Sequence, residues 1–494
     1  MNEIVRPRQL LRRDRRTESL RRFGDAGVIA AVLTVFLVHF RPWQGGLLED
    51  WGLALAWDQE GFGGFVSRLP MTLGRPLHLL PQYIGMAMSD GGFVGPYAVL
   101  GAVAVGQLLA ARWAVAPLTS LRSLQWTLAL AVALHPWWAA GDILRFLPAQ
   151  VSVLACVVWF GASIRYLATG RWYWASVVVA VPLFGLLAYQ APAGALVMAA
   201  VLIALLRDTS IRRRITLVAL TTAVVLAVVT WSVVLAPLYS SDSYEAQLES
   251  PSIALVASIR AILRTLALNA PTAVAALILV GAGVIALGFR QSLSAVHAWL
   301  LLFALAATPL AAFTYASQLA HLNDPERVAL PVGFMIWVVA CCALPALSRD
   351  RQVRLAGVVA ALAGTALATV VGYGTWTTYA ASQAVLVDSV QTVREAVPES
   401  ARLVVSDPSG HFGDIYTLLP PHLNLALDAE YGPGADVELC TPAGVVRDHP
   451  TAAVYPIPTT PGCGALLDGI AVTSLGALKT SEGTFDVFEL PAPE

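Results

Sequence analysis

The sequence predicts an α-helical polytopic membrane protein of about eleven transmembrane helices, followed by a small α/β domain. Of its 494 residues, 57% are hydrophobic and only 13% are charged, whereas roughly 25% are charged in an ordinary soluble protein. Apolar runs recur that are long enough to cross a bilayer, which takes about 20 residues at 1.5 Å per residue. Beyond residue 375 these runs stop and the alternating pattern of strands begins.

The chain begins with a basic arm, residues 1–24, that precedes any apolar run and contains eight arginines. Such a block normally stays in the cytoplasm. A cleaved signal peptide would need a small-residue cleavage site after the apolar stretch 28–40, and none follows it. We therefore expect a retained arm and a first membrane anchor.

Residues 25–375 are expected to form the membrane domain. The fifth and sixth of its apolar runs meet at Tyr189-Gln190-Ala191-Pro192 and could instead be one kinked segment. The eleven runs cover residues 25–42, 93–111, 122–140, 146–164, 172–189, 191–206, 215–236, 271–288, 295–316, 328–347 and 355–373.

The arginines are distributed unevenly when these runs are threaded alternately from a cytoplasmic N-terminus. Twenty then fall on the cytoplasmic side and seven in the outside loops of the membrane domain. The positive-inside rule favours this orientation, and an odd number of spans sends the C-terminus to the outside. The sequence thus predicts a multi-pass cell-membrane protein with its C-terminus outside the cytoplasm.

Two outside loops are long enough to hold structure of their own. In the loop 41–92, the segments 51–65 and 75–88 mix apolar with polar residues and are expected to lie as helices in the membrane interface. In the loop 238–270, the segment 253–268 is amphipathic. Neither loop is apolar enough to cross the bilayer.

Residues 376–494 are expected to form an extracytoplasmic α/β domain. The pattern predicts an amphipathic helix over 382–397, a strand over 402–406, and strands over 470–475 and 484–490 around a Ser-Glu-Gly turn. Two cysteines, Cys440 and Cys463, lie in this domain and are a natural disulfide pair if it faces an oxidising compartment. The other three of the five cysteines lie inside apolar runs and are expected to pack there.

An acidic pair, Glu49 and Asp50, follows the first apolar run directly, where a helix should emerge on the outer side. In a site walled by protein and lipid, a carboxylate can be held as a base. The alternative is that the pair only makes the loop hydrophilic. What favours chemistry is that the same face carries further charges next to helix ends.

These charges are Arg75, His78, Arg145 and Arg327, all at outside helix ends against the positive-inside bias. An anionic head group would explain them, because arginine forks match phosphate oxygens. For each arginine alone, a structural salt bridge to a nearby carboxylate explains it equally well. The phosphate interpretation rests on their recurrence on one face.

Three uncharged residues are candidates for lining a substrate cavity on this side: Trp51, Tyr189 and Gln190. Trp51 could stack on a sugar ring, although a role in the aromatic belt at the interface is the simpler reading. Tyr189 and Gln190 lie between short apolar segments, where a plain helix turn explains them about as well. No cysteine or histidine spacing typical of a metal site occurs.

Short motifs on this face resemble the GT-C superfamily of membrane glycosyltransferases, and most closely its serotype-converting glucosyltransferase type, which uses a polyprenyl-phosphate sugar. The likeness covers roughly residues 25–375 in topology, and its motifs are short and degenerate. They are Glu49-Asp50-Trp51, Gly74-Arg75-Pro76-Leu77, His135-Pro136 ahead of Arg145-Phe146, and Tyr189-Gln190.

The resemblance implies that a first-loop aspartate, Asp50 here, is the base on the acceptor hydroxyl, with Glu49 as its neighbour or substitute. Relatives often carry two aspartates there, so which carboxylate is the base stays open. The lipid phosphate is already a good leaving group, and positive charge from Arg75, Arg145 or Arg327 would stabilise it. No cofactor is required, and the sequence neither requires nor excludes a divalent metal.

The expected partners are thus a polyprenyl-phosphate sugar, a cell-envelope glycan, lipid or protein as acceptor, and the bilayer, with no nucleic acid. Two alternatives remain. A carrier of lipid-linked sugars would predict charges in mid-span and related halves, neither of which is visible. An envelope polymerase or ligase would also depend on arginines but would not need the Glu49-Asp50 pair.

Overall fold

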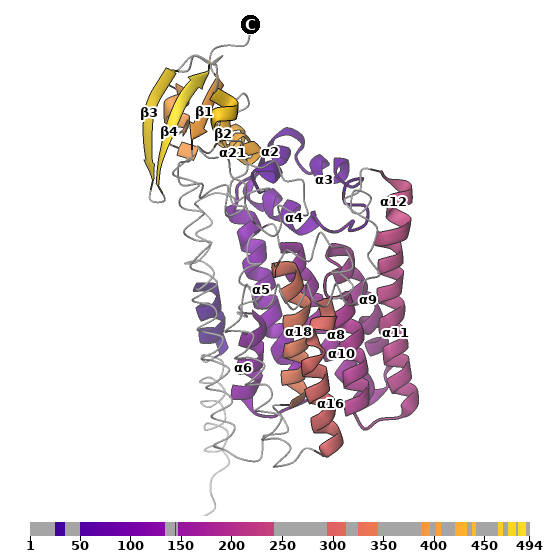
Figure 1. Cartoon of the computed structure of the whole chain (residues 1–494). Helices are drawn as coiled ribbons and strands as arrows, with labels where there is room; N and C mark the ends of the chain where they lie inside the picture. Colours follow the sequence, from indigo (N-terminus) through magenta and orange to yellow (C-terminus); the bar gives the residue numbers. More distant parts are fainter. Residues whose placement is uncertain are drawn as a thin grey trace, which may run out of the picture.

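The structure is a computed structural model, and its helical and sheet parts are drawn in colour in Figure 1. The residues it describes are 25–34, 50–133, 144, 147–241, 294–312, 325–343, 387–388, 390–395, 402–406, 420–431, 437–440, 463–467, 473–480 and 483–490.

Three of the described helices are long and apolar enough to cross a membrane. They are α5 (Val94–Val115), α8 (Leu147–Thr169) and the continuous run Ile211–Tyr239. This last run consists of α11 (Ile211–Thr230), the π-helix η2 (Trp231–Leu235) and α12 (Ala236–Tyr239). All three coincide with predicted spans, and they indicate that the chain associates with a membrane.

Shorter apolar helices occupy the positions of further predicted spans. The predicted spans 271–288 and 355–373 lie outside the described residues, so the number of eleven stays a prediction. These helices are Asp25–Thr34, α9 (Trp172–Ala188), α10 (Ala193–Leu206), α16 (Ala295–Ala306), which the 3₁₀-helix η3 (Thr308–Ala312) follows, and the part 330–343 of α18 (Pro325–Ala343). Helix α6 (Arg122–Ala133) lies within the predicted span 122–140.

These helices pack around a shared apolar core. Helix α8 lies between α5 and α9, and α10 packs on α11 and α18. Trp159 and Phe160 of α8 are fully buried, and Trp337 of α18 donates its indole N–H to Leu128 O over 2.9 Å. The helices α9 and α10 are separate and meet at Tyr189, as predicted, rather than forming one kinked segment.

The loop 41–92, which is predicted to lie outside, folds over its described part into three short helices at one end of the bundle (Figure 1). We call them the outer helices. They are α2 (Asp50–Glu60), α3 (Gly63–Ser67) and α4 (Leu80–Ser89). The predicted helix 51–65 is confirmed as α2 and α3, but the prediction of a helix from Arg75 was wrong, because the chain turns until Leu80. Arg75 precedes Pro76, and a residue before proline is disfavoured in the helical region.

Apolar side chains of the outer helices and of the turns between them are exposed. Five large ones are at least 45% exposed, as expected for helices that lie in a membrane interface. They are Phe62, Val66, Met71, Ile84 and Met88.

The opposite end of the bundle carries a cluster of arginines held by protein groups. Asp25 accepts from Arg112 over 3.1 Å, from Arg122, and from the indole N–H of Trp126 over 2.9 Å. Arg165 donates to Trp113 O over 2.8 Å and stacks on the Trp113 ring. We call this the arginine end, defined by Arg112, Arg122 and Arg165.

The C-terminal domain is built on a four-stranded sheet of order β2-β1-β4-β3, with β1 and β2 parallel and the other pairs antiparallel. The predicted strand 402–406 and the pairing of the last two predicted strands are confirmed. The prediction missed β2, α21 and α22. The elements are β1 (Arg402–Ser406), α21 (Pro420–Tyr431), β2 (Val437–Cys440), α22 (Cys463–Leu467), β3 (Thr473–Thr480) and β4 (Gly483–Leu490).

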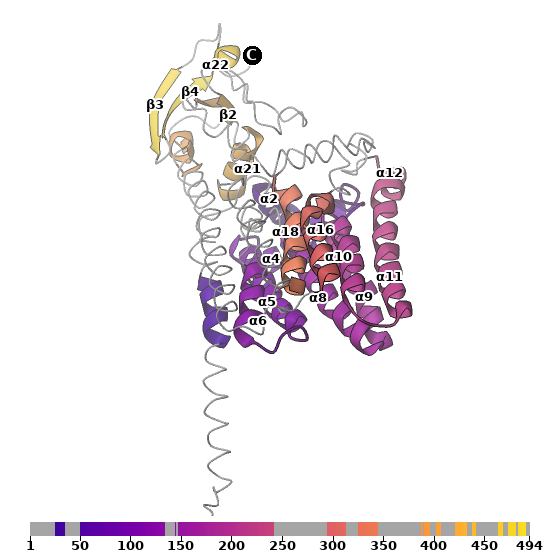
Figure 2. The same ribbon diagram turned by 60° about the horizontal axis from the view of Figure 1, so that its bottom comes forward.

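The predicted disulfide between Cys440 and Cys463 is formed and joins β2 to α22. The sheet lies beyond the same end of the bundle as α2, and α21 packs directly on α2 (Figures 1 and 2). The C-terminal domain therefore stands next to the helix that begins with Asp50.

Candidate functional site

The turn between α3 and α4 lies against the end of α9 and carries two of the predicted site residues. Leu77 N donates to Leu187 O over 3.2 Å, and the Nδ1 atom of His78 lies 3.1 Å from Ala188 O. The last carbonyls of a helix lack partners within the helix. Leu77 and His78 therefore supply an end cap for α9, which fixes the turn around Arg75.

A second set of hydrogen bonds holds the same turn from η2 and the α9–α10 junction. Gly74 O accepts from Gln190 Nε2 over 3.2 Å and from Ser232 Oγ over 2.6 Å. Gln190 Nε2 also donates to Ser232 Oγ over 2.8 Å, and Trp231 donates its indole N–H to Leu73 O over 2.9 Å. Trp231 and Ser232 lie in η2, and single π-turns inside helices are frequent at functional sites.

Tyr189 completes this cluster. Its side chain is 3% exposed and stacks on the His78 ring with 6.1 Å between ring centroids. Its carbonyl accepts from Ser152 Oγ of α8 over 2.9 Å. Arg75, 7% exposed, lies in the turn that these contacts fix, and its backbone N–H donates to Thr72 O over 2.7 Å.

Four of the predicted site residues thus meet in one place, although they are far apart in the sequence. The bonds from Trp231 to Leu73 and from Ser232 to Gly74 were not predicted, because a serine and an indole within an apolar run carry no signal of their own. We call Arg75, His78, Tyr189, Gln190 and Ser232 the turn cluster.

Asp50 is the first residue of α2, and its side chain is completely buried. A carboxylate at a helix N-terminus interacts favourably with the helix dipole. The carboxylate also acts electrostatically on the phenol of Tyr97 in α5. Burying a charge is costly unless other groups compensate it, so a wholly buried carboxylate at this position needs a reason beyond solubility.

The indole of Trp51 faces apolar protein. It is 2% exposed and packs in one core with residues of the C-terminal domain. Its ring also meets Phe93 edge to face, with centroids 5.0 Å apart. Trp51 thus packs in an apolar core, and its stacking on a sugar ring stays a prediction.

Three predicted residues are described only in part or not at all. Glu49 and Arg145 lie outside the described residues. Arg327 belongs to the first turn of α18, where the backbone alone is described. Their parts in the site stay predictions.

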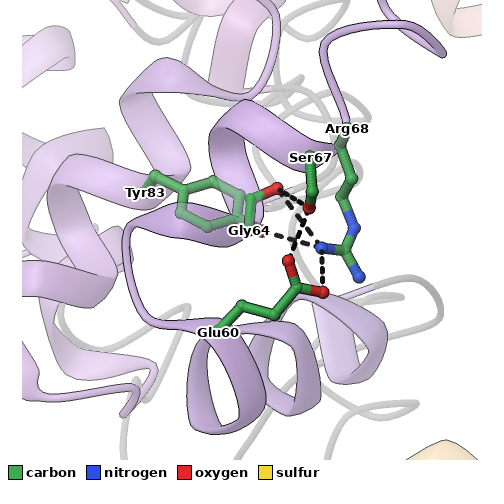
Figure 3. A network of polar contacts seen from close by, with 5 residues as sticks. All are labelled: Glu60, Gly64, Ser67, Arg68 and Tyr83. Carbon is green, nitrogen blue, oxygen red and sulfur yellow. Dashed lines mark hydrogen bonds and ion pairs between the residues drawn. The ribbon is translucent and has the colours of Figure 1, made fainter.

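A polar network beside the site was not predicted (Figure 3). Glu60 accepts from Ser67 Oγ over 2.5 Å and forms an ion pair with Arg68 at 3.5 Å. Arg68 also approaches Gly64 O and the Tyr83 hydroxyl, at 3.3 and 3.4 Å. Burial raises the pKa of Tyr83, so the phenol stays protonated at neutral pH. The network ties α2, α3 and α4 together.

A scan of protein-family models, a search of curated proteins and a search of solved structures each find no match to this chain. The resemblance to GT-C enzymes thus rests on the motif residues alone. What the site does has to be argued from its own chemistry.

No group of three or more histidine, cysteine, aspartate or glutamate side chains converges on a metal-sized site among the described residues. Dependence on a divalent metal remains an open prediction. At this end of the bundle the described residues offer a buried carboxylate at Asp50 and, in the turn cluster, a buried Arg75 with the polar groups that fix its turn.

Proposed function

We propose that the protein is a membrane glycosyltransferase that moves a sugar from a polyprenyl-phosphate donor to a cell-envelope acceptor on the outer face of the membrane. The observation that carries the proposal is the complete burial of Asp50 at the start of α2. It lies at the end of the bundle that also holds the buried Arg75 and the apolar outer helices. A carboxylate withdrawn from water beside a lipid surface suits proton removal from a hydroxyl group.

The proposed reaction uses these groups in one step. The Asp50 carboxylate takes the proton of the acceptor hydroxyl, and the hydroxyl oxygen forms a bond to C1 of the sugar. The bond between C1 and the phosphate oxygen breaks, and the lipid phosphate leaves with the electron pair. Arg75 stabilises the charge on this phosphate, which is most valuable where water is excluded. Glu49 is the neighbour or substitute of Asp50 as base.

The turn cluster supports the proposal by fixing Arg75. The turn is bonded on two sides, to α9 through Leu77 and His78 and to η2 through Gly74. A guanidinium held in place before the reaction does not need to reorganise as charge develops on the phosphate. His78 and Gln190 thus act in the proposal by holding the backbone around Arg75.

The exposed apolar side chains of the outer helices and the turn between them support a lipid-borne donor. Phe62, Met71 and Met88 are 45%, 55% and 64% exposed and can sit among lipid chains. With the outer helices at this level, the polyprenyl chain stays in the bilayer while its phosphate reaches the polar end of the bundle. A soluble nucleotide sugar would not need such a surface.

The test is transfer by the purified protein from a panel of polyprenyl-phosphate sugars to envelope glycans, with Asp50→Asn compared with the wild type. Loss of a general base lowers the rate by about 100-fold or more. Asp58→Asn is the matched control, because Asp58 lies in the same helix and is exposed. It should transfer at the wild-type rate.

Undiminished transfer by Asp50→Asn would remove Asp50 from the mechanism. Transport of the intact donor across vesicles, with no cleavage of the sugar from the phosphate, would replace the enzyme by the carrier alternative. Transfer that depends on Arg75 but not on Asp50 or Glu49 would favour the polymerase or ligase alternative.

A further inference from the structure

The first turn of α2 belongs to two cores at once. The Asp50 side chain is buried near Tyr97 of α5, in the helical body. The next residue, Trp51, is 2% exposed and belongs to the same apolar core as Val405, Leu427 and Val487 of the C-terminal domain. Adjacent residues on a helix diverge by about 100°. The carboxylate therefore lies against the helical body, while the indole lies where Phe93, which precedes α5, meets the core of the outer domain.

The indole is held for its shape. Its Nε1 atom is buried and has no hydrogen-bond partner within the described part of the chain. The indole is also 2% exposed, and the apolar side chains of its cluster belong to the core that the outer domain shares with α2. Its role there is packing.

The contact extends from Trp51 into the outer domain as a continuous path. A Cβ at Gly52 would lie 3.6 Å from Leu425 Cδ1 of α21. Beside Leu425, the Asn424 side chain accepts from Val437 N at the start of β2, over 2.9 Å. Strand β2 ends at Cys440, which the disulfide ties to Cys463. Helix α21 thus connects α2 to the sheet.

We propose that Trp51 is a positioning residue that couples the C-terminal domain to Asp50, so that the outer domain must be docked on α2 for the carboxylate to be held buried in the site. The role of Asp50 as base rests on the proposed function, whereas the coupling itself does not. The far end of α2 is held differently, since its last turn is half-exposed or exposed and is tied to α3 and α4 through Glu60.

The first test measures the burial of residue 50 without any substrate. Asp50→Cys in the full chain is treated with a membrane-impermeant maleimide, alone and combined with Trp51→Ala, Trp51→Phe or Trp57→Ala. Trp57 is the matched control, since it lies in the same helix, its ring lies beside Tyr83 and Gly91, and it is not a member of the described core around Trp51. The unaltered protein gives the labelling background of the native cysteines.

The expected result is slow labelling of the Asp50→Cys variant, alone and with Trp57→Ala. Labelling should be about tenfold faster with Trp51→Ala, an opening of about 1.4 kcal/mol. Trp51→Phe keeps an aromatic ring in the shared core and should leave the introduced thiol protected. An intact Cys440–Cys463 disulfide and an unchanged elution volume show that each variant is folded. If the introduced thiol is labelled as slowly with Trp51→Ala as without it, and the protein is folded, the coupling is overturned.

The second test measures transfer with Asp50 present. Trp51→Ala should lower kcat by about 100-fold, as a small displacement of a reacting group can, and leave the KM for the donor within about twofold. Trp57→Ala should change neither. A folded Trp51→Ala with exposed residue 50 and wild-type kcat refutes positioning and leaves the glycosyltransferase proposal standing. No transfer by the wild type from any donor refutes the glycosyltransferase proposal, while the labelling test still decides the coupling.

Discussion

The two ends of the helical bundle treat charged side chains in opposite ways. At the arginine end, Asp25, Arg112 and Arg122 stay partly exposed and satisfy one another near the surface. At the other end, Asp50 is 0% and Arg75 7% exposed. Charges that anchor helices at a membrane surface keep contact with water, because the free energy needed to desolvate them exceeds the free energy gained from a surface ion pair. Charges that are buried are therefore the better candidates for a site.

The neighbours of the charged groups differ in the same way. Arg165 donates to the carbonyl of Gly161 within its own helix and to that of Trp113 in the last turn of α5, and it lies over the Trp113 indole. The turn cluster connects segments far apart in the sequence, from Gly74 to Ser232. If the arginine end anchors helices and the other end carries the chemistry, substitutions at the arginine end should change stability alone. Substitutions at the other end should change transfer or donor binding.

The largest effect in this comparison is expected for Arg75→Gln. Loss of a buried guanidinium that stabilises a leaving phosphate should lower kcat/KM for the polyprenyl-phosphate donor by about 100-fold. Arg68→Gln is the matched control, because Arg68 precedes Arg75 in the same loop and serves the network with Glu60 and Tyr83. Equal loss in both variants would mean that the outer helices simply need their charges to fold.

An intermediate effect is expected for Gln190→Ala combined with Ser232→Ala. The two changes remove both side-chain donors to Gly74 O, and an unmade buried hydrogen bond costs about 1–3 kcal/mol. The midpoint of thermal unfolding should fall, and the Kd for the donor should rise.

The control for this pair is Gln125→Ala at the arginine end, which removes a similar bond to Thr119 O. It should lower the unfolding midpoint without changing the Kd. A double variant that loses stability but keeps the Kd would reduce the turn cluster to a packing role.

Much of the helical frame could be predicted from the sequence, because long apolar runs are selected by the thickness of the bilayer itself. The turn at Arg75 was misjudged as helix because the apolar period continues through Pro76 to Leu80. The cap of α9 by His78 depends on two segments meeting in space, which one sequence does not encode locally. The sequence placed Arg75, Tyr189 and Gln190 on one face of the membrane domain but did not predict that their segments meet.

The C-terminal domain shows the same limit. The hairpin of β3 and β4 was predictable from a local turn, whereas β2 pairs with β1 in parallel after an intervening helix, α21. The burial of Trp51 was missed because an indole at a membrane exit is normally a belt residue. Only the packing of α21 on α2 shows that another domain covers it.

The smallest effect is expected for Asp25→Asn. It leaves Arg112 and Arg122 without their carboxylate, and a partly exposed ion pair contributes about 1 kcal/mol or less. The unfolding midpoint should fall slightly, less so at high salt, with kcat unchanged. Asp208→Asn is the control, since Asp208 is fully exposed. A large loss of transfer in Asp25→Asn would contradict the division between the two ends.

The central claim is that the two ends face opposite compartments, with the end that carries Asp50 outside the cytoplasm. The most direct measurement is labelling of single introduced cysteines in intact cells with a membrane-impermeant maleimide. Asp58→Cys in α2 and Arg171→Cys before α9 both replace exposed residues, at opposite ends. The account predicts labelling of the Asp58→Cys variant in intact cells and of the Arg171→Cys variant only after permeabilisation. The reverse pattern in intact cells, with the thiol at position 171 labelled and the thiol at position 58 protected, would contradict it.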